Sequence, residues 1–442
     1  MNVEVENLPN CIASLRIELP PDRVAKEWDK VVRNFREVAR IPGFRPGKAP
    51  PAVIEAKFRK QIQDQLTKKL VSETTSEAIR EKGLKVLSIS GVDDVEFSSD
   101  KTMRFTTTLI TAPEFELPEY KGIPVKVPPM EVTEEEVQRA IEKMRESRAT
   151  FSDVEDRTLQ VGDFAVIDYA TLLNNQPLLE VYPRVPRMLS GGQEFWIKLD
   201  EKTLLEGFSD ELVGMRPNET REFDLAVADN YPIRELVGQA LHFNVTLKAI
   251  KSMQLPEVNN EFASQIRDGL TLGQLHTVLR EDMTAEKQRL AETIKRNQII
   301  DYLVSRVECE LPQSYVKDET RRIMSEIVQE NQRRGVTEEV LRENQKDIVN
   351  TASRNAKERL KANFILTKIA EKENIGVSDA EFMQRVQQLA DQYRMAQAKM
   401  MSELEDKGAS GHVREEVLIG KVLDFLTSNA NIEISSERPV NR

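Results

Sequence analysis

Hydrophobic positions in the first quarter of the chain follow two different periods. Alternating or strand-like runs predict half-buried strands at residues 11–19, 84–90, 93–98 and 103–111. Apolar residues also recur every three to four positions, which predicts helices over about residues 24–38 and 51–82. A strand, two helices and further strands together predict an α+β head over residues 1–112.

The pattern changes twice more after this head. Five prolines within residues 113–129 fix φ and remove backbone donors, so this segment is expected to be a semi-rigid linker. Thr133 followed by Glu136 fits a capping box, which predicts that a helix begins there. Residues 150–250 have strand patterns, whereas most of the rest has helical spacing and a second capping box at Ser378.

These patterns predict a multidomain α+β protein. The expected parts are an α+β head (1–112), a proline-rich linker followed by one helix (113–149), a strand-rich domain (150–250), a helical part (251–432) and a disordered tail (433–442). Four methionines of the body suit a surface that accepts many partners, or alternatively fill gaps in its core: Met383, Met395, Met400 and Met401.

The segment between the two predicted head helices is a stiff loop. Residues 41–51 contain four prolines and two glycines, so neither a helix nor a strand can run through them. Phe44 and Arg45 lie near its centre. Together they would form a binding site, in which the ring stacks or inserts and the guanidinium binds phosphate or carboxylate groups. The alternative is a rigid surface turn whose Phe44 folds back onto the core.

Charge is distributed unevenly along the chain. The whole protein has a net charge of −11, yet residues 23–69 contain 13 Lys and Arg against 5 Asp and Glu. An acidic protein with one basic end can dock that end on nucleic acid while the rest is repelled. An ordinary basic helix face would have the same composition, but its position around the stiff loop favours docking.

Composition excludes several other classes of function. No apolar run approaches the length of a membrane span, the N-terminus does not resemble a signal peptide, and Cys11 and Cys309 lie far apart in the sequence. We therefore expect a cytoplasmic protein with free thiols. The three histidines are scattered, and Ser190-Gly191-Gly192 lacks the ending of a phosphate loop, so no metal, cofactor or ATP-driven cycle is expected.

The string Gly43-Phe44-Arg45-Pro46-Gly47-Lys48-Ala49-Pro50 resembles the ribosome-docking signature of the trigger factor family, bacterial chaperones that wait at the exit of the ribosomal tunnel. The resemblance covers nearly the whole chain and includes a boundary motif at residues 255–263. It implies a ribosome-binding head, a small FKBP-type prolyl isomerase domain that is antiparallel β with one helix, and an extended all-α chaperone body with arms, whose first helix follows the linker. The implied ribosome contacts are Gly43, Phe44, Arg45, Pro46, Gly47 and Lys48.

Residues 150–250 resemble an FKBP domain in the order of their motifs. Isomerisation must lower a barrier of roughly 18–20 kcal/mol to rotation about the X-Pro bond, and apolar walls that fit the twisted amide can do this without a nucleophile or metal. The resemblance implies a catalytic site made of Tyr169, Glu180, Phe195, Leu204, Leu205, Phe208, Tyr231 and Phe243. The alternative for each of these residues is plain packing of a small β-domain.

One departure from the FKBP pattern bears on catalysis. Many FKBP domains have a Phe-Asp pair after the first hairpin, where this chain has Leu178-Leu179-Glu180-Val181-Tyr182. Glu180 is the candidate for the acid, and the missing aromatic predicts reduced isomerase activity while peptide binding survives.

The resemblance implies an ATP-independent chaperone that docks at the tunnel exit, binds nascent polypeptides and isomerises X-Pro bonds. One alternative is a ribosome-bound holdase with little isomerase activity, and another is a chaperone-isomerase unrelated to ribosomes. The implied partners are protein and RNA of the large ribosomal subunit, nascent and unfolded polypeptides, and a second copy in a weak homodimer off the ribosome, with no membrane.

Overall fold

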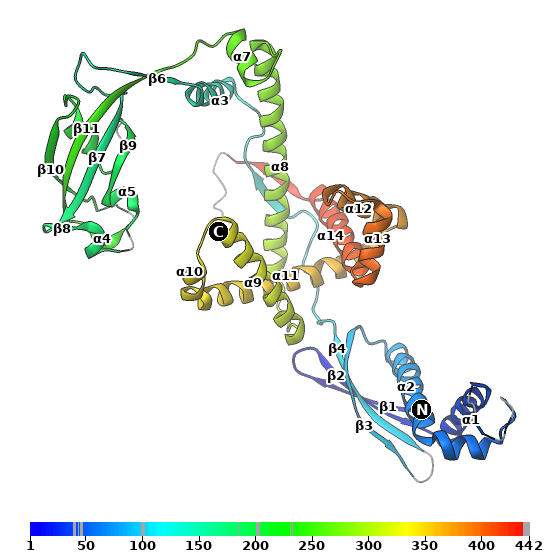
Figure 1. Ribbon diagram of the computed structural model, residues 1–442. Helices are drawn as coiled ribbons and strands as arrows, with labels where there is room; N and C mark the ends of the chain where they lie inside the picture. The colour runs from blue at the N-terminus through cyan, green and yellow to red at the C-terminus, as the bar shows by residue number, and fades with distance from the viewer. Residues whose placement is uncertain are drawn as a thin grey trace. The chain divides into compact units, whose positions relative to one another are not determined.

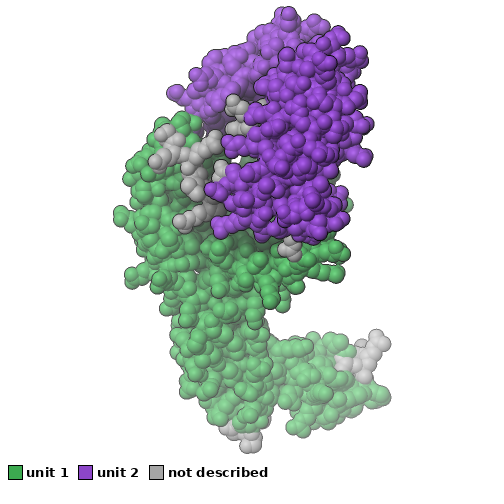
Figure 2. Space-filling model, turned by 90° about the vertical axis from the view of Figure 1, so that its left-hand side faces the viewer, with its two compact units in different colours: residues 1–129, 290–442 green, residues 130–289 purple. Residues whose placement is uncertain are grey.

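The computed structural model describes residues 1–38, 41–42, 44, 47–98, 102–183, 185–199, 204–229, 231 and 233–435 (Figure 1). The chain forms two compact units, coloured in Figure 2. Unit 1 contains Met1–Pro129 and Leu290–Arg442, and unit 2 contains Met130–Arg289. Unit 2 therefore includes residues 130–149 and 251–289, which the sequence pattern had assigned to the helical body. The multidomain α+β organisation is confirmed.

The head is an antiparallel four-stranded sheet in the order β1-β2-β4-β3. Its strands are β1 (Asn2–Leu8), β2 (Ile12–Leu19), β3 (Val86–Phe97) and β4 (Met103–Thr111). Strand β1 was not predicted; it is an edge strand that is mostly exposed, although Val3 packs against the core of the head. Strand β3 is one strand rather than the two that were predicted at 84–90 and 93–98, because irregularities in its register interrupt the alternation.

Two helices pack against one face of this sheet, as predicted. They are α1 (Pro21–Val38) and α2 (Pro51–Lys82). Helix α2 ends at Gly83, whose φ of 64° is the left-handed conformation that favours glycine. The alternating residues Leu15 and Ile17 of β2 and Phe105 of β4 are buried in one cluster with Leu66 of α2. The apolar residues of the alternating strands and those of the periodic helices thus share a single hydrophobic core.

The linker and the helical body of unit 1 share a second core. Strand β5 (Pro124–Val127) pairs in parallel with β12 (Asn431–Ile434) near the other end of the chain. The side-chain amide of Gln298 accepts from the backbone nitrogen of Lys126 and donates to its carbonyl, at 2.9 and 2.6 Å. The tail predicted at 433–442 therefore begins inside a strand, and residues 436–442 lie outside the described residues.

Seven helices of the body follow in chain order. They are α8 (Leu272–Arg306), α9 (Gln313–Arg333), α10 (Glu338–Glu343), α11 (Gln345–Glu373), α12 (Asp379–Gln392), α13 (Gln397–Asp406) and α14 (Ser410–Ser428). The predicted capping box at Ser378 and Glu381 begins α12. Met400 is buried in the core of α12–α14, Met395 and Met401 pack against that core, and Met383 is exposed.

Unit 2 contains a six-stranded antiparallel sheet. Its strands are β6 (Thr150–Asp153), β7 (Phe164–Leu173), β8 (Gln176–Pro177), β9 (Gly191–Lys198), β10 (Thr220–Ala226) and β11 (Ala240–Gln254). Its short helices are α4 (Leu178–Val181), α5 (Arg187–Ser190), α6 (Phe208–Leu212) and a 3₁₀ turn, η1 (Arg234–Leu236). Strand β11 lies between β10 and β7, and it continues four residues past the predicted boundary at 250 to pair with β6.

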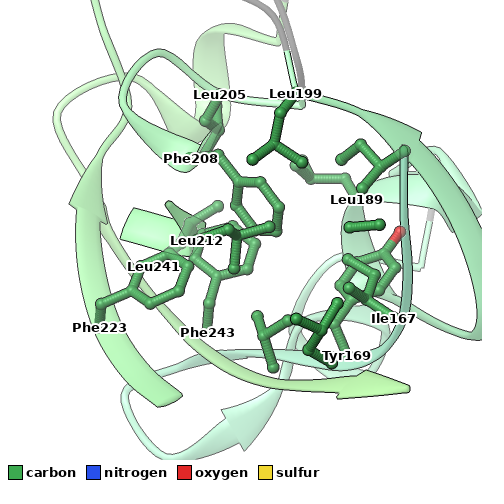
Figure 3. Close-up of a cluster of buried hydrophobic side chains, with 14 of the residues drawn as sticks. Ile167, Tyr169, Leu189, Leu199, Leu205, Phe208, Leu212, Phe223, Leu241 and Phe243 are labelled. Atoms are coloured by element: carbon green, nitrogen blue, oxygen red, sulfur yellow. The ribbon is translucent and has the colours of Figure 1, made fainter. Parts of the chain in front are cut away.

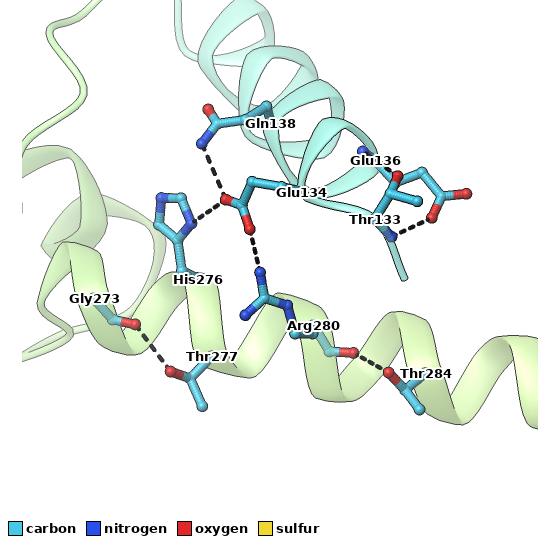
Figure 4. Close-up of polar contacts among 9 residues, drawn as sticks. All are labelled: Thr133, Glu134, Glu136, Gln138, Gly273, His276, Thr277, Arg280 and Thr284. Atoms are coloured by element: carbon cyan, nitrogen blue, oxygen red, sulfur yellow. Dashed lines mark hydrogen bonds and ion pairs between the residues drawn. The ribbon is translucent and has the colours of Figure 1, made fainter. Parts of the chain in front are cut away.

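A small helical cluster completes unit 2. Helices α3 (Glu134–Ser147) and α7 (Asn260–Ile266) bury Val137 and Phe262 against Leu275 near the start of α8. The capping box predicted at Thr133 is present, with the hydroxyl accepting from Glu136 and the Glu136 carboxylate accepting from Thr133 (Figure 4). Arg280 of α8 donates to Glu134 of α3 in the same view. Over the described residues, no helix is long and apolar enough to cross a membrane.

One buried acid joins the two helices of the head. Glu27 of α1 is only 9% exposed, and its carboxylate accepts from Lys30 at 2.5 Å and from Lys69 of α2 at 2.8 Å. These two lysines lower the pKa of Glu27 from 4.5 to about 2. Because the folded pKa is lowered, the stabilising contribution is present above pH 4.5 and is lost as the pH falls toward 2. Both lysines are partly exposed, so solvent screens part of it.

We expect Glu27→Gln to lower the free energy of unfolding of the head by about 1–2 kcal/mol at neutral pH. The difference from wild type should vanish as the pH approaches 2, because the wild-type carboxyl is then protonated too. Urea unfolding can be followed by the fluorescence of Trp28 in a Trp196→Phe background, where it is the remaining tryptophan. Asp29→Asn, an exposed position on the same helix, is the matched control. An equal loss in both variants would contradict the role given to Glu27.

Candidate functional site

Aromatic side chains from several elements of unit 2 meet in one cluster (Figure 3). Tyr169 lies at a buried position of β7, where inward and outward residues alternate. Phe243 lies on β11 directly opposite Phe223 of β10. Phe208 is the first residue of α6, which follows Gly207 in the left-handed conformation. Strand pairing and one short helix therefore bring together residues that span more than seventy positions of sequence.

Edge-to-face contacts connect the rings into a network. The centroid of Phe208 lies 5.1 Å from that of Phe243 and 5.5 Å from that of Phe223. The ring of Tyr169 lies 5.5 Å from Phe195 and 6.4 Å from Phe208. Such pairs contribute about 0.5–1.5 kcal/mol beyond the area that they bury. The family resemblance implied five aromatic residues for the site. Direct ring contacts join four of them: Tyr169, Phe195, Phe208 and Phe243. The fifth is Tyr231.

The hydroxyl of Tyr169 is tied to the backbone rather than to an acid. It donates to the carbonyl of Met188 in the α5 segment. Burial raises the pKa of Tyr169 to about 12, so the hydroxyl stays protonated and remains a donor at physiological pH. This bond holds the segment before β9 against the aromatic cluster.

Two glycines allow β9 to pass close to Tyr169. A Cβ on Gly191, whose φ is +145°, would lie 2.8 Å from the Tyr169 carbonyl oxygen. A Cβ on Gly192 would lie 3.2 Å from Cε1 of the same ring. The sequence Ser190-Gly191-Gly192 had been excluded as a phosphate loop. In the structure its two glycines allow strand β9 to lie close to Tyr169.

The remaining apolar positions surround this network at different depths. Phe208 and Phe243 are fully buried, and Leu205 is nearly so. Phe195, Leu204 and Tyr231 are partly buried and pack against the cluster. The deep group forms a floor and the partly exposed group forms a rim that a peptide could contact. Burial raises the pKa of the Tyr231 phenol, so this rim residue is also neutral.

The structure differs from the predicted set of site residues at two positions. Glu180 is exposed on α4, and the structure does not bring it to the aromatic cluster. Phe223, which the sequence reading left out, contacts both Phe208 and Phe243. Its alternation with Leu225 could have indicated an inward position, but only the register of β10 and β11 sets it opposite Phe243.

The arrangement offers an apolar surface and a few neutral hydroxyls. An X-Pro amide that enters such a site loses its hydration, and loss of hydration favours the twisted, less polar transition state over the planar amide. Over the described residues, no group of three His, Cys, Asp or Glu side chains could hold a metal ion.

The loop between α1 and α2 is described in part. Phe44 is 43% exposed and does not belong to the head core, so the alternative in which it folds back does not occur. Lys48 is exposed, and Gly47 has a φ of +79°. Ala49 is buried and anchors the end of the loop. The predicted contact residues Gly43, Arg45 and Pro46 lie outside the described residues.

Comparison with known proteins agrees with these modules. Family models match three segments of the chain: bacterial trigger factor protein (TF) at residues 1–144, FKBP-type peptidyl-prolyl cis-trans isomerase at 155–248 and bacterial trigger factor protein (TF) C-terminus at 271–428. A curated trigger factor of Akkermansia muciniphila is 32% identical over 438 residues, which is 99% of this chain and 100% of the relative. The chain belongs to the trigger factor family. Members are ribosome-associated chaperones with a peptidyl-prolyl isomerase domain, and this chain is one of them.

Other relatives extend the comparison. The trigger factor of Opitutus terrae is 29% identical, with 98% of each chain covered. A solved structure of the trigger factor chaperone, described for promiscuous substrate recognition in folding and assembly, covers 97% of this chain and 99% of its own. Its sequence identity is 20% and its TM-score is 0.47. The aromatic cluster lies wholly within the segment that the isomerase family model matches.

Neighbouring residues of β9 provide a matched test of the site. Phe195 packs on Tyr169, whereas Trp196 points to the other face, is 47% exposed and contacts Phe151. We expect Phe195→Ala to lower kcat/KM for an X-Pro tetrapeptide about tenfold, and Trp196→Ala to change it by less than about twofold. Exchange NMR of the peptide with the full chain measures this. Equal effects in both variants would remove Phe195 from the site.

Proposed function

We propose that the chain docks on the large ribosomal subunit at the tunnel exit through the tip of its head, at residues 43–48. The observation that carries this proposal is the outward display of Phe44 on a basic head. Residues 23–69, which include the tip, contain thirteen Lys and Arg against five acids. Lys48, one of the thirteen, is exposed.

Rigidity supports docking through this tip. Four prolines in residues 41–51 limit the conformations that the free loop can adopt. A loop that is already stiff loses less conformational entropy on binding, so more of the contact energy appears as affinity. Ribosomal RNA would meet the cations through its phosphates, and this part of the binding weakens as salt rises.

A broad cleft in unit 1 supports the binding of nascent and unfolded polypeptides. Its volume is about 3680 Å³, and its walls come from β3 of the head and from α8, α9, α11 and α14. Apolar Ile300, Ile323 and Phe364 line it together with charged Glu319 and Arg359. The cleft is several times larger than a small-molecule site, which holds roughly 300–1000 Å³. Its mixed lining suits extended chain without selecting one sequence, and binding of this kind needs no ATP.

The isomerase domain is proposed to act on X-Pro bonds with reduced activity, through Tyr169, Phe195, Leu204, Leu205, Phe208, Tyr231 and Phe243. Reduced activity is supported by the missing Phe-Asp pair and by Glu180, the candidate acid, which is exposed on α4 and does not belong to the aromatic cluster. The alternative function, a ribosome-bound holdase with little catalysis, is favoured by the same observation. The proposed setting is the cytoplasm, with a weak homodimer off the ribosome.

Ribosome co-sedimentation tests the docking proposal. A triple Ala variant of Phe44, Arg45 and Lys48 should lose most of its salt-sensitive binding, because it removes the ring and two phosphate-binding cations. The matched control is Arg333→Ala, Val340→Ala and Arg342→Ala, which removes two cations and an apolar residue that is 45% exposed from the body. Co-sedimentation of the tip variant at the wild-type level would refute docking through the tip.

Refolding of a protein whose slow phase is limited by proline isomerisation separates the two alternatives. Catalytic amounts of the wild-type chain should accelerate the slow phase, because the rim and floor of the site are assembled. Glu180→Gln should change the rate by less than about twofold, since Glu180 is exposed on α4. A wild-type chain that suppresses aggregation without accelerating the slow phase would establish the holdase. A tenfold loss in the Glu180 variant would place that carboxylate in the site.

A further inference from the structure

The two cysteines of the chain are brought to the same joint of unit 1. The thiol of Cys11, in the turn between β1 and β2, donates to the carbonyl oxygen of Glu310 at a distance of 3.2 Å. These residues are 299 positions apart in the sequence. The accepting carbonyl belongs to the residue that directly follows Cys309. The only two thiols of 442 residues therefore lie on either side of one contact between the head and the body.

Three hydrogen bonds hold this contact. Besides the thiol, the backbone nitrogen of Asn10 donates to Oε2 of Glu310 at 3.0 Å. The side-chain amide of Gln313, at the start of α9, donates to Oδ1 of Asn10 at 3.4 Å. The turn is thereby seated on the segment that connects α8 to α9. In the reduced protein, polar contacts join head and body at this point, and their net strength is modest because water competes for them.

The backbone of the turn fixes where the Cys11 thiol points. Asn10 and Cys11 both have left-handed φ values, 63° and 58°. They are the last two residues of the three-residue loop, Pro9 to Cys11, that joins the paired residues Leu8 and Ile12, and a cysteine is strained in this conformation. The register from Leu8 paired with Ile12 onward holds the turn at the end of two paired strands. The thiol is therefore presented by a rigid element and does not search a wide volume.

The other cysteine is held equally firmly. Cys309 is partly buried and packs against the hydrophobic core formed by the linker with α8, α11 and α14. Both cysteines are free and only partly exposed. Burial raises the pKa of both thiols; nearby Glu310 and Cys309 raise that of Cys11 further, and Lys361 opposes the effect at Cys309.

We propose that Cys11 and Cys309 form a reversible intramolecular disulfide when the protein meets a peroxide. One thiolate attacks the O–O bond, giving a sulfenic acid, and the released hydroxide takes up a proton to become water. The second thiolate then attacks the sulfenyl sulfur and displaces hydroxide, which is protonated to a second water. Two thiols are oxidised and one peroxide is reduced, so atoms and electrons balance. A dithiol reductant reverses the bond.

The bond would replace a polar contact with a covalent tie between head and body. A disulfide needs Cα atoms within about 7 Å, and the thiol of Cys11 already touches the backbone beside Cys309. Closing a loop of almost three hundred residues restricts the unfolded chain and also limits the separation of the head from the body. The raised pKa values make the reaction slow at neutral pH and faster as the pH rises, because the thiolate is the reactive form.

Peptide mapping of the full chain tests this proposal. The reduced protein is treated with hydrogen peroxide at mildly alkaline pH, alkylated and digested with trypsin without reduction. We expect the loss of both thiols and a linked pair of peptides, residues 1–16 with residues 307–317. The yield should not depend on protein concentration, and dithiothreitol should abolish the linkage. Hydrogen exchange in the turn at residues 8–12 should slow in the oxidised form.

Three variants keep the test specific. Cys11→Ser and Cys309→Ser should each abolish the link. The double variant Cys11→Ser with Ser14→Cys keeps two thiols but moves one along β2, away from the joint, and should link at least about tenfold more slowly. Equal linking in that variant would overturn the proposal. It would equally be overturned if peroxide yielded only sulfinic acids or intermolecular dimers, or if linking were faster in urea than in the folded chain.

Discussion

Packing of an extended linker into a helical core is the constraint on which the rest of this structure depends. Tyr120, Ile123 and Val125 are buried among Ile299 and other residues of α8, α11 and α14. A proline-rich segment makes few hydrogen bonds within itself, so this burial, the Gln298 side chain and the pairing with β12 hold it in place. The linker joins the head to the body, and unit 2 follows in the chain as an insertion between β5 and the later part of α8. Each unit can then keep a core of its own.

The isomerase domain uses its core for two purposes. Phe208 and Phe243 are fully buried and support the domain, while Phe195 and Tyr231 remain partly accessible above them. The fully buried rings thus hold the partly accessible ones in position. The Tyr169 hydroxyl is held in turn by the Met188 carbonyl of the α5 segment.

Sequence patterns predicted the parts of the fold that depend on local interactions. Helix α2 and both capping boxes were found because spacing and caps involve residues within one or two turns. Strand β1 was missed because two alternating valines, Val3 and Val5, are a short signal, and only the pairing with β2 places this segment at the edge of the sheet. Phe223 was missed because its role follows from the pairing of β10 with β11. Glu180 was assigned by its position in a motif, whereas the direction of the short helix α4 determines its exposure.

By itself the sequence determined the order of the modules, the basic composition of the head, the proline-rich string at residues 41–51 and the family, since all of these are properties of composition and of short motifs. Tertiary structure alone decided which distant segments meet. The C-terminal strand returns to pair with the linker, and Cys11 lies beside Cys309 although nothing in their spacing indicated it. The physical reason is that such contacts arise from the packing of whole elements, whose relative placement no local period encodes.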